Sequence, residues 1–598
     1  MPAVSPLDDT DGVVRLLLSA DGVALDETVE VISVSVRRGV NSVPSARIEL
    51  ADGDIPSRTF PLSDSAHFKP GVLLSIKAGY QSDPTAVLFE GLIVRHGLQV
   101  RGDNDARLIV ECRDKAVLMT VGRRNANFID QTDSAVIEAL AGEHGLAIDV
   151  DATELSHTEL VQHYCSDWDF MLSRAEVNGL LVVATDGKLA VKAPEVDAEA
   201  ALKVAYGDEL IEFQADLDAR SQFASAQAFS WDIKGQAALE GSASAPVTLP
   251  AQGDLDSATL AGVIGLPTWR LQSGAPQPLA ALTSWAKAQQ LKSGLARLRG
   301  RLSFQGSALA KVGGLIELSG VGARFSGKLL VTGLHHEIAD GNWVTEAEFG
   351  LAPDWFVERA DVIAPPGAGL LPGVHGLQVG IVMKLDADPA GEQRVQVKLP
   401  MLQAATEGIW ARLVQFHASN AFGAFFLPEV GDEVVLGYFA DDPSHPVVLG
   451  SLYSSKQAPP YPLEAANDIK AIVTRCKSKL EFNEADKVIT ITTPGNNKIV
   501  LSDKDQSILL QDQNGNKVEL APGGITLDSP ADIKITAKGT ITLDAVGAIS
   551  VTSKADVKLA GLNIAAQAQV GFTAKGNASA ELSAAGQTVV KGAMVMIN

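Results

Sequence analysis

The chain has 598 residues, which is too long for one hydrophobic core, so several domains are expected. Nearly half of the residues are apolar and a fifth are charged, a balance that excludes a disordered chain. The formal charge of −23 disfavours binding to phosphate backbones and anionic lipids, so no nucleic-acid partner is expected.

The negative charge lies in the first three quarters of the chain. From Ala465 onward, 14 Lys and Arg residues stand against 13 Asp and Glu residues. Cys112, Cys165 and Cys476 are far apart and form no CxxC pair, which argues against a disulfide framework and against a zinc knuckle. The sequence has neither a secretory signal at its start nor an apolar run of membrane-spanning length. We therefore expect a chain made in the cytoplasm, which another machine carries outward if it leaves the cell.

The first part of the chain is predicted to be mainly β. Apolar and polar residues alternate in five segments between Gly, Pro and Asp residues, which is the pattern of half-buried strands. These segments are 29–39, 45–53, 71–80, 86–100 and 106–114.

Two helices and a hairpin are predicted after these strands. Helices over 133–144 and 167–178 begin at Asp or Ser residues, carry apolar residues on one face and end at glycines. Residues 180–194 alternate again, and Asp186-Gly187 in their middle is typical of a tight hairpin turn.

Segments rich in small residues and proline divide the rest of the chain. The range 236–277 is predicted to be a loop-heavy insertion, and a helix over 279–298 follows it. Residues 364–376 are predicted to be a linker. Five short strands within 378–453 suit a small barrel, and 454–462 is the next break.

The last quarter of the chain repeats a short apolar pattern. Two apolar positions recur every eight residues with one polar or small residue between them, and the pattern resumes after a five-residue step. The four series are Ile525, Ile533, Ile541, Ile549 and Val557; Leu527, Ile535, Leu543, Val551 and Leu559; Leu562, Val570, Ala578, Gly586 and Met594; and Ile564, Phe572, Ala580, Thr588 and Met596.

Each of these octads is predicted to hold a short strand with one apolar face. Gly539 and Gly547 fall where a bend would separate the strands. Such a strand buries its apolar face only against stacked coils or other chains, so a β-helical shaft is expected. The octads leave open whether one chain forms a solenoid or three chains intertwine, because three strands of eight residues would also close a solenoid coil.

The order of these regions resembles the VgrG-type spike family of contractile injection systems, which includes phage tail hubs, type VI secretion and extracellular injection particles. The most specific match is LPEVGDEVVLGYFADDPSHPVVLGSLYSSKQAPPY (427–461), which is similar to the oligosaccharide/oligonucleotide-binding (OB) barrel of that family. Three head segments are similar to the phage late-control tail protein, and the range 236–277 matches least. The head segments are LFEGLIV (88–94), CSDWDFMLSRAEVNGL (165–180) and GVGARFSGKLLVTGLHHEIADGNWVTEAEF (320–349).

The resemblance implies a mainly β fold with a few helices: tail-hub β-barrel domains, an OB-fold barrel and a C-terminal triple-stranded β-helix needle. The implied regions are a late-control-like head (1–363), a linker (364–376), the OB barrel (377–458), a second linker (459–479) and the octad needle (480–598).

The resemblance also implies a function and partners. It implies a non-enzymatic homotrimer that is the hub and membrane-piercing spike of a contractile injection apparatus, delivered outward when the particle fires. In this family the hub caps the inner tube protein, the needle carries a PAAR-type tip protein, and baseplate components and effectors are further partners. The sequence does not separate a phage from a type VI or an extracellular particle.

Four short groups invite a chemical interpretation, and each has a structural alternative. His335-His336-Glu337 lacks the spacing of a zincin helix and lies among predicted strands. Residues 441–445 gather Asp, Ser and His around a proline, which is typical of a turn. Residues 503–507 and 512–516 lack the complete calcium-loop pattern, and Asn514-Gly515 favours a hairpin turn.

The competing function is a polysaccharide-degrading tail-spike enzyme on a β-helix. Glu481, Glu484 and Asp486 could act as paired carboxylates, whereas charged residues at the start of a shaft are usually solvated. Such enzymes usually need aromatic residues in a groove, but Phe482 and Phe572 are the only aromatic residues after Ala465. We therefore predict no catalytic residue.

Cofactors and inserted enzymes are not expected either. About 20 residues separate Tyr461 from the first needle strand expected near Leu480, which leaves no room for an enzyme domain. No histidine follows His445, so an H-x-H iron site like that of some spikes is not expected in the needle. We predict no metal and no cofactor.

The octads reach Met594 and Met596 close to the last residue of the sequence. Three copies of Met594, Met596 and Ile597 would form a small apolar platform, and the flexible thioether of methionine suits an irregular partner surface. These three residues are predicted to dock the tip protein. The alternative is that the last residues fray, as chain ends often do.

Overall fold

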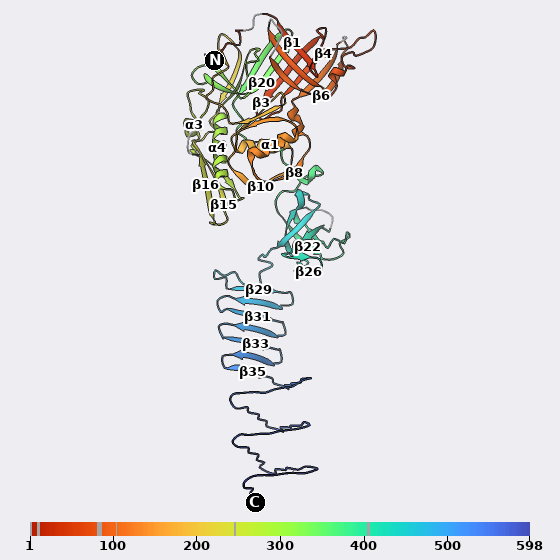
Figure 1. The fold of residues 1–598 in the computed structure, drawn as a ribbon, viewed down its shortest axis with the longest axis vertical. Coiled ribbons are helices and arrows are strands. Elements are labelled where there is room, and N and C mark those ends of the chain that lie inside the picture. Colours follow the sequence, from red (N-terminus) through yellow and green to blue (C-terminus); the bar gives the residue numbers. More distant parts are fainter. Residues whose placement is uncertain are drawn as a thin grey trace. The chain divides into compact units, whose positions relative to one another are not determined.

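The computed structural model describes residues 3–8, 12–80, 86–102, 105–243, 247–402 and 407–597. Short parts of the predicted head, insertion and barrel, and Asn598 of the predicted needle, lie outside these ranges. The chain divides into two compact units, Met1–Leu452 and Tyr453–Asn598 (Figure 1). No helix in the described ranges is long and apolar enough to cross a membrane.

The largest element of the first unit is one 13-stranded sheet. Eleven strands follow one another in the order β14-β18-β21-β20-β3-β4-β7-β6-β5-β1-β2, and β13 and β19 attach beside β20. The five segments predicted between residues 29 and 114 are confirmed as β3 to β7. The strands are β1 Val14–Ala20, β2 Val23–Ala24, β3 Val31–Gly39, β4 Ser45–Ala51, β5 Leu73–Tyr80, β6 Val87–Val100, β7 Ala106–Arg113, β13 Leu202–Ala205, β14 Leu210–Leu217, β18 Leu298–Gln305, β19 Leu315–Ser319, β20 Gly327–Ala339 and β21 Asn342–Phe349.

Alternation along the strands explains why this sheet has a buried face. In β4, Ile48 and Leu50 are fully buried in the head core. Arg47 and Glu49 alternate with them, lie on the other face and form an ion pair of 2.8 Å. Because successive side chains point to opposite faces of a strand, one register satisfies both the core and the solvent.

Both helices predicted in the middle of the head are confirmed as α1 (Asp133–Glu143) and α2 (Asp167–Val177). The side chains of Thr132 and Ser166 cap them by accepting backbone N–H groups of the first turn. The predicted hairpin is confirmed as β11 and β12, and both residues of its Asp186-Gly187 turn have positive φ, as this turn type requires. The strands of this region are β8 Arg124–Thr132, β9 Ala147–Val150, β10 Ser156–Cys165, β11 Leu181–Thr185 and β12 Lys188–Lys192.

The range 236–277 is more regular than predicted, and the expectation of a loop-heavy insertion is wrong for much of it. It holds β16, α3 and β17, and the two strands flank β15 in a three-stranded sheet covered by α4. Its small residues let α4 approach closely, since a Cβ on Gly241 would lie 2.6 Å from the Leu282 side chain. Residues 244–246 lie outside the described ranges. The elements are β15 Ser225–Asp232, β16 Ala237–Ala243, α3 Ser257–Ile264, β17 Thr268–Ser273 and α4 Leu279–Leu295.

The predicted small barrel is confirmed as a closed five-stranded barrel in the order β22-β23-β24-β28-β27. Fully buried valines and leucines, among them Val382, Val434 and Leu436, fill it. A short hairpin, β25 and β26, stands between β24 and β27 and pairs only with itself. The strands are β22 Gln378–Lys384, β23 Val395–Lys398, β24 Ile409–Leu413, β25 Ala418–Ser419, β26 Phe422–Gly423, β27 Glu433–Tyr438 and β28 Pro446–Ser451. Six 3-10 turns complete the first unit: η1 Ala66–Phe68, η2 Lys115–Thr120, η3 Phe356–Glu358, η4 Pro366–Gly369, η5 Pro400–Leu402 and η6 Phe439–Asp441.

The second unit begins with a seven-stranded antiparallel meander, whose strands stack like rungs (Figure 1). Its first strand, β29, precedes the strand expected near Leu480 and pairs with it. The strands are β29 Ile469–Val473, β30 Lys479–Asn483, β31 Val488–Thr492, β32 Lys498–Ser502, β33 Ser507–Gln511, β34 Lys517–Ala521 and β35 Gly524–Asp528.

Residues 529–597 form extended segments separated by bends, without strand pairing (Figure 1). The bends recur at 538–539, 546–547 and 554–555, so the predicted period of eight is present in the backbone. Further along, Leu562 and Val570 fall at bends and are fully exposed, whereas Ile564 and Phe572 follow two residues later.

This register differs from the one predicted after the five-residue step. Ile564 and Phe572 continue the series of Ile541 and Ile549, which also lie two residues after a bend. The residues of the series that begins at Leu562 therefore lie at the bends rather than within the extended segments. One repeat has seven residues instead of eight.

Candidate assembly interface

The meander of the second unit carries one face that is apolar and unprotected within a single chain. Cross-strand pairing aligns its apolar residues in two columns, because partners in an antiparallel sheet share a face. One column is Ile472, Leu480, Ile491, Ile499, Leu510, Val518 and Leu527, and the other is Phe482, Ile489, Leu501, Ile508, Leu520 and Ile525.

These columns are not a hydrophobic core of one chain. Ile499 is 38% exposed, Leu510 44% and Leu527 57%, whereas the corresponding valines and leucines inside the barrel are fully buried. Burying the exposed half of such a side chain stabilises an assembly by about 1 kcal/mol. With ten such side chains per chain, the face strongly favours association.

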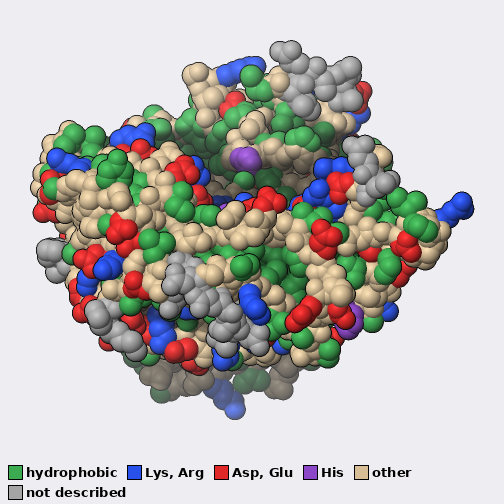
Figure 2. Space-filling view, turned by 90° about the horizontal axis from the view of Figure 1, so that it is seen from above, with side chains coloured by type: hydrophobic (Ala, Val, Ile, Leu, Met, Phe, Trp, Pro, Cys, Tyr) green, Lys and Arg blue, Asp and Glu red, His purple; other side chains and the backbone are tan. Residues whose placement is uncertain are grey.

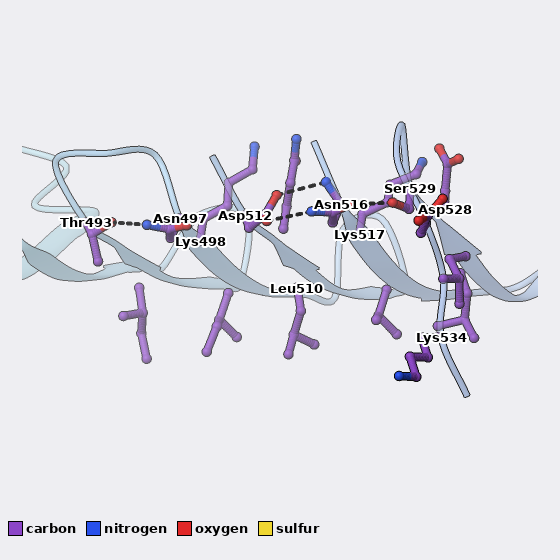
Figure 3. Close-up of a pocket in the computed structure, with 17 residues that line it drawn as sticks. Thr493, Asn497, Lys498, Leu510, Asp512, Asn516, Lys517, Asp528, Ser529 and Lys534 are labelled. Atoms are coloured by element: carbon purple, nitrogen blue, oxygen red, sulfur yellow. Dashed lines mark hydrogen bonds between the residues drawn. The ribbon is translucent and has the colours of Figure 1, made fainter. Parts of the chain in front are cut away.

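The first of these columns lines a groove of about 640 Å³ (Figure 3). Leu510 lies on the side of the sheet opposite Lys498, Asp512, Asn516 and Lys517 in this view. Asn516 donates to Asp512 at 2.7 Å along the polar edge. The sheet therefore has a polar, hydrogen-bonded edge on one side and an apolar face without a partner on the other.

The sequence carries a signal for this face that is separate from the octads. Lys479, Lys498 and Lys517 open three similar segments 19 residues apart, KLEFN, KIVLS and KVELA, in each of which the second and fourth residues are apolar. Two antiparallel strands and their turns take 19 residues, so the apolar positions recur at unequal steps instead of every eight residues. The 19-residue period therefore identifies these strands in the sequence.

Beyond Asp528, the backbone itself lacks a partner within the chain. No inter-strand backbone hydrogen bond is formed within the described stretch 529–597. Extended segments leave rows of N–H and C=O groups that pair only with another strand. Ile533, Ile541 and Ile549 continue the apolar series on this stretch and are 52–55% exposed. Backbone and side chains thus both require other chains.

The predicted docking residues lie at the far end of this stretch. Met594 falls at a bend, and Met596 continues the series of Ile564 and Phe572 two residues after it. Met594, Met596 and Ile597 are 79–91% exposed in the single chain. Whether they dock a partner stays a prediction.

The histidine pair of the sequence lies in the middle of β20, not at a strand end, and its two rings point to opposite faces. His335 Nε2 lies 2.8 Å from Ser35 Oγ and 3.3 Å from Glu337. His336 is buried, and its Nδ1 lies 2.9 Å from Thr345 Oγ1. Burial, helped by nearby positive charges, lowers the pKa of His336 to about 3. Neighbours on opposite faces do not bind one metal ion.

The other predicted groups are turns. Asp442 accepts the Ser444 backbone N–H at 2.8 Å and lies 3.0 Å from the ring of His445. In 512–516, Asp512 accepts two backbone N–H groups, and Gly515 has a φ of 91°, which confirms the predicted hairpin turn. In 503–507, Asp505 and Ser502 bond to each other across the turn between β32 and β33.

The carboxylates considered for glycan cleavage are held in ion pairs. Glu481 accepts from Lys479 at 2.7 Å and from the hydroxyl of Tyr461, and these bonds lower its pKa. Asp486 pairs with Lys504 at 3.0 Å. A glycosidase acid needs a raised pKa, so this arrangement does not favour one. Among the described residues, no group of three or more His, Cys, Asp or Glu side chains could hold a metal ion.

Three family models match the chain. Residues 10–340 match the Alg8 N-terminal domain, which covers more than half of the chain. Residues 378–453 match the type VI secretion system/phage-baseplate injector OB domain, and residues 488–598 match the phage baseplate V C-terminal trimerisation domain. The last two ranges coincide with the closed barrel and with most of the second unit.

Curated relatives match over shorter stretches. The chain is 26% identical over 204 residues to the type VI secretion system spike protein VgrG1b of Pseudomonas aeruginosa, which covers 31% of this chain and 27% of that protein. It is 31% identical over 106 residues to VgrG5 of the same organism, covering 17% and 13%. The chain thus spans about a quarter or less of the length of these relatives.

Among solved structures, the 43 kDa tail protein of prophage MuSo2 from Shewanella oneidensis is similar with a TM-score of 0.43 at 11% identity, covering 57% of this chain and 98% of that one. The Escherichia coli c3393 protein, a type VI secretion component, is similar with a TM-score of 0.36 at 14% identity, covering 73% and 99%.

Proposed function

This chain belongs to the family described by the Alg8 N-terminal domain and, more broadly, to the VgrG-type spikes of contractile injection systems, and we propose that three copies form the hub and piercing spike of such a machine. The proposal assigns the protein a mechanical role. The head and barrel form the hub, and the second unit forms a three-stranded shaft.

The observation that carries this proposal is the open face of the second unit. One chain leaves two apolar columns exposed and the backbone of 529–597 unpaired. A family model for a trimerisation domain matches this same region. Three intertwined chains supply both the apolar burial and the missing backbone partners, and they leave no open edge, which gives a shaft resistance to bending.

The remaining partners follow from this role. We assign the head to the inner tube and the baseplate, the far end of the shaft to a PAAR-type tip protein, and effectors to the shaft or tip as cargo. The completed particle would carry the chain outward on firing. On the head face in Figure 2, acidic and basic side chains are interspersed, which agrees with protein partners rather than nucleic acid.

The enzymatic alternative has weaker support. The glycan-cleaving arrangement would need paired acids in an aromatic groove. Glu481 and Asp486 are instead held by lysines, and the groove of the second unit is lined by aliphatic and polar side chains. We therefore propose that the chain has no hydrolytic activity of its own, and that purified protein leaves peptidoglycan and surface polysaccharide intact.

The tip-docking prediction is tested by Met596→Asp. Charge is scarce near this end, since Lys575, Glu581 and Lys591 are the only charged residues after Lys558. A carboxylate introduced at an apolar junction loses its hydration on binding, so at least tenfold less tip protein should be recovered in a pull-down. The trimer should persist because the octads above are unchanged.

Ser583→Asp is the matched control, since it adds the same charge at an exposed polar position 13 residues away. Its tip recovery should equal that of the wild type. Equal recovery with Met596→Asp would mean that Met594, Met596 and Ile597 do not form the docking surface.

The trimer itself is tested by light scattering of the purified full chain at low micromolar concentration. A mass of three chains is expected, about three times 62.7 kDa. A monodisperse monomer with a folded shaft would instead support a one-chain solenoid and refute the proposal.

A further inference from the structure

The barrel carries a hairpin that exposes its aromatic side chains. Residues 414–430 connect β24 to β27 and include the β25–β26 pair, which lies outside the closed barrel. Four phenylalanines project from this segment with 57–88% of their surface exposed: Phe416, Phe422, Phe425 and Phe426. This concentration of exposed aromatic rings is typical of an interface.

The hairpin is ordered by its own hydrogen bonds and by the edge-to-face contact of the Phe422 ring with His417, whose ring centroids lie 5.7 Å apart. Ala424 donates its backbone N–H to the His417 carbonyl at 2.9 Å, and the Gln415 amide donates to the Phe426 carbonyl at 2.9 Å. Gly423 has a φ of 141°, and a Cβ there would lie 2.6 Å from the His417 carbonyl oxygen. The segment is therefore a preformed surface, which lowers the entropy that binding would cost.

Charge is almost absent from this segment. Glu429 is its one charged residue, in a chain in which a fifth of the residues are charged. Other parts of the barrel surface carry ion pairs, such as Arg394 with Asp388 at 2.6 Å. An apolar, uncharged surface favours a protein partner over a phosphate or an anionic membrane.

The length of the segment that joins the barrel to the shaft favours another copy of this chain as the protein partner. Residues 452–468 join the end of β28 at Ser451 to the first shaft strand at Ile469. Fully extended, this segment spans at most about 60 Å. In the proposed trimer, the three barrels are therefore tethered to one shaft, at an effective concentration for one another of the order of millimolar.

We propose that residues 414–430 of each copy pack against the neighbouring copies of this chain, so that the phenylalanines form a second trimer contact besides that of the shaft. This inference rests on the proposed trimer and adds to it. The shaft gains its stability from aligned columns, whereas the barrel contact is made by inserted aromatic side chains. It would fix the barrels to one another through residues remote from the octads.

The test places a photo-reactive analogue in the hairpin. Phe425 is replaced by p-benzoyl-phenylalanine, which preserves the aromatic ring, and the full-length protein is irradiated. Covalent species of two and three times the chain mass are expected on a denaturing gel, with the cross-linked peptides mapping to the barrel of a second copy. The same analogue at Ser444, an exposed polar turn of the same barrel, should give at least tenfold less product.

Light scattering of the same samples before irradiation separates the two ideas. A trimer that yields no cross-link, or cross-links only within one chain, overturns the barrel contact and leaves the proposed shaft trimer standing. A monomer overturns the proposed trimer and the barrel contact with it.

Discussion

Replacing Ile499 by aspartate is expected to abolish the trimer. Ile499 lies between Ile491 and Leu510 in an apolar column, and its side chain lines the open groove. Three carboxylates would be placed together in the shaft interior. Each desolvated charge costs several kcal/mol, more than the roughly 1 kcal/mol that each buried apolar side chain contributes, and the three like charges repel one another, so the shaft should not close at this level. Light scattering should show monomer where the wild type shows three chains.

Val500→Asp is the control for this change. Val500 is the next residue of β32 and points to the opposite face, where its cross-strand neighbours are Thr490 and Leu509. The same cross-strand row already carries the carboxylates of Glu481 and Glu519, so a further carboxylate should be tolerated there and the trimer should be kept. If both variants remain trimeric, the apolar columns do not line the shaft interior. If both become monomeric, the effect is general unfolding of the sheet.

Acidification is expected to destabilise the head through His336. Its pKa is about 3 in the folded head, mainly because of burial, against an ordinary value of 6.5. Below pH 6.5 the unfolded chain therefore binds a proton that the folded head does not bind. Stability is lost as the pH falls through 6.5, by about 3 kcal/mol at pH 4.5.

The measurement is urea unfolding followed by tryptophan fluorescence between pH 7.5 and 4.5. Six of the seven tryptophans precede residue 364, so the signal reports the head. His336→Gln should flatten the pH dependence in this window, because glutamine keeps a hydrogen-bonding side chain beside Thr345 without titrating. A wild-type slope that the substitution leaves unchanged would assign the acid sensitivity to other groups.

Much of the fold was predictable because its signals are local. Strict alternation located β3 to β7, and the Asp186-Gly187 turn located a hairpin. The prediction of a loop-heavy insertion over 236–277 was wrong for much of the range because alanine and glycine are common both in loops and under a closely packed helix. Only the neighbour α4, which lies far along the chain, distinguishes these cases.

The assembly interface was only partly predictable for a different reason. Octads reveal a regular repeat, but the strands from Lys479 to Ala521 alternate in direction, so their apolar positions are unequally spaced. For residues 529–597 the partner strands belong to no part of one chain. Sequence periodicity therefore predicted the need for partners, while the number of chains came from the resemblance to a known family.

The backbone of 529–597 is expected to pair with other copies of the chain. Hydrogen–deuterium exchange of the full-length protein, followed by mass spectrometry of peptides from this stretch, tests it most directly. Strand pairing between chains predicts amides that remain protected for hours, although no inter-strand backbone bond forms within this stretch of one chain. Exchange within seconds in a sample of trimer mass would contradict the account.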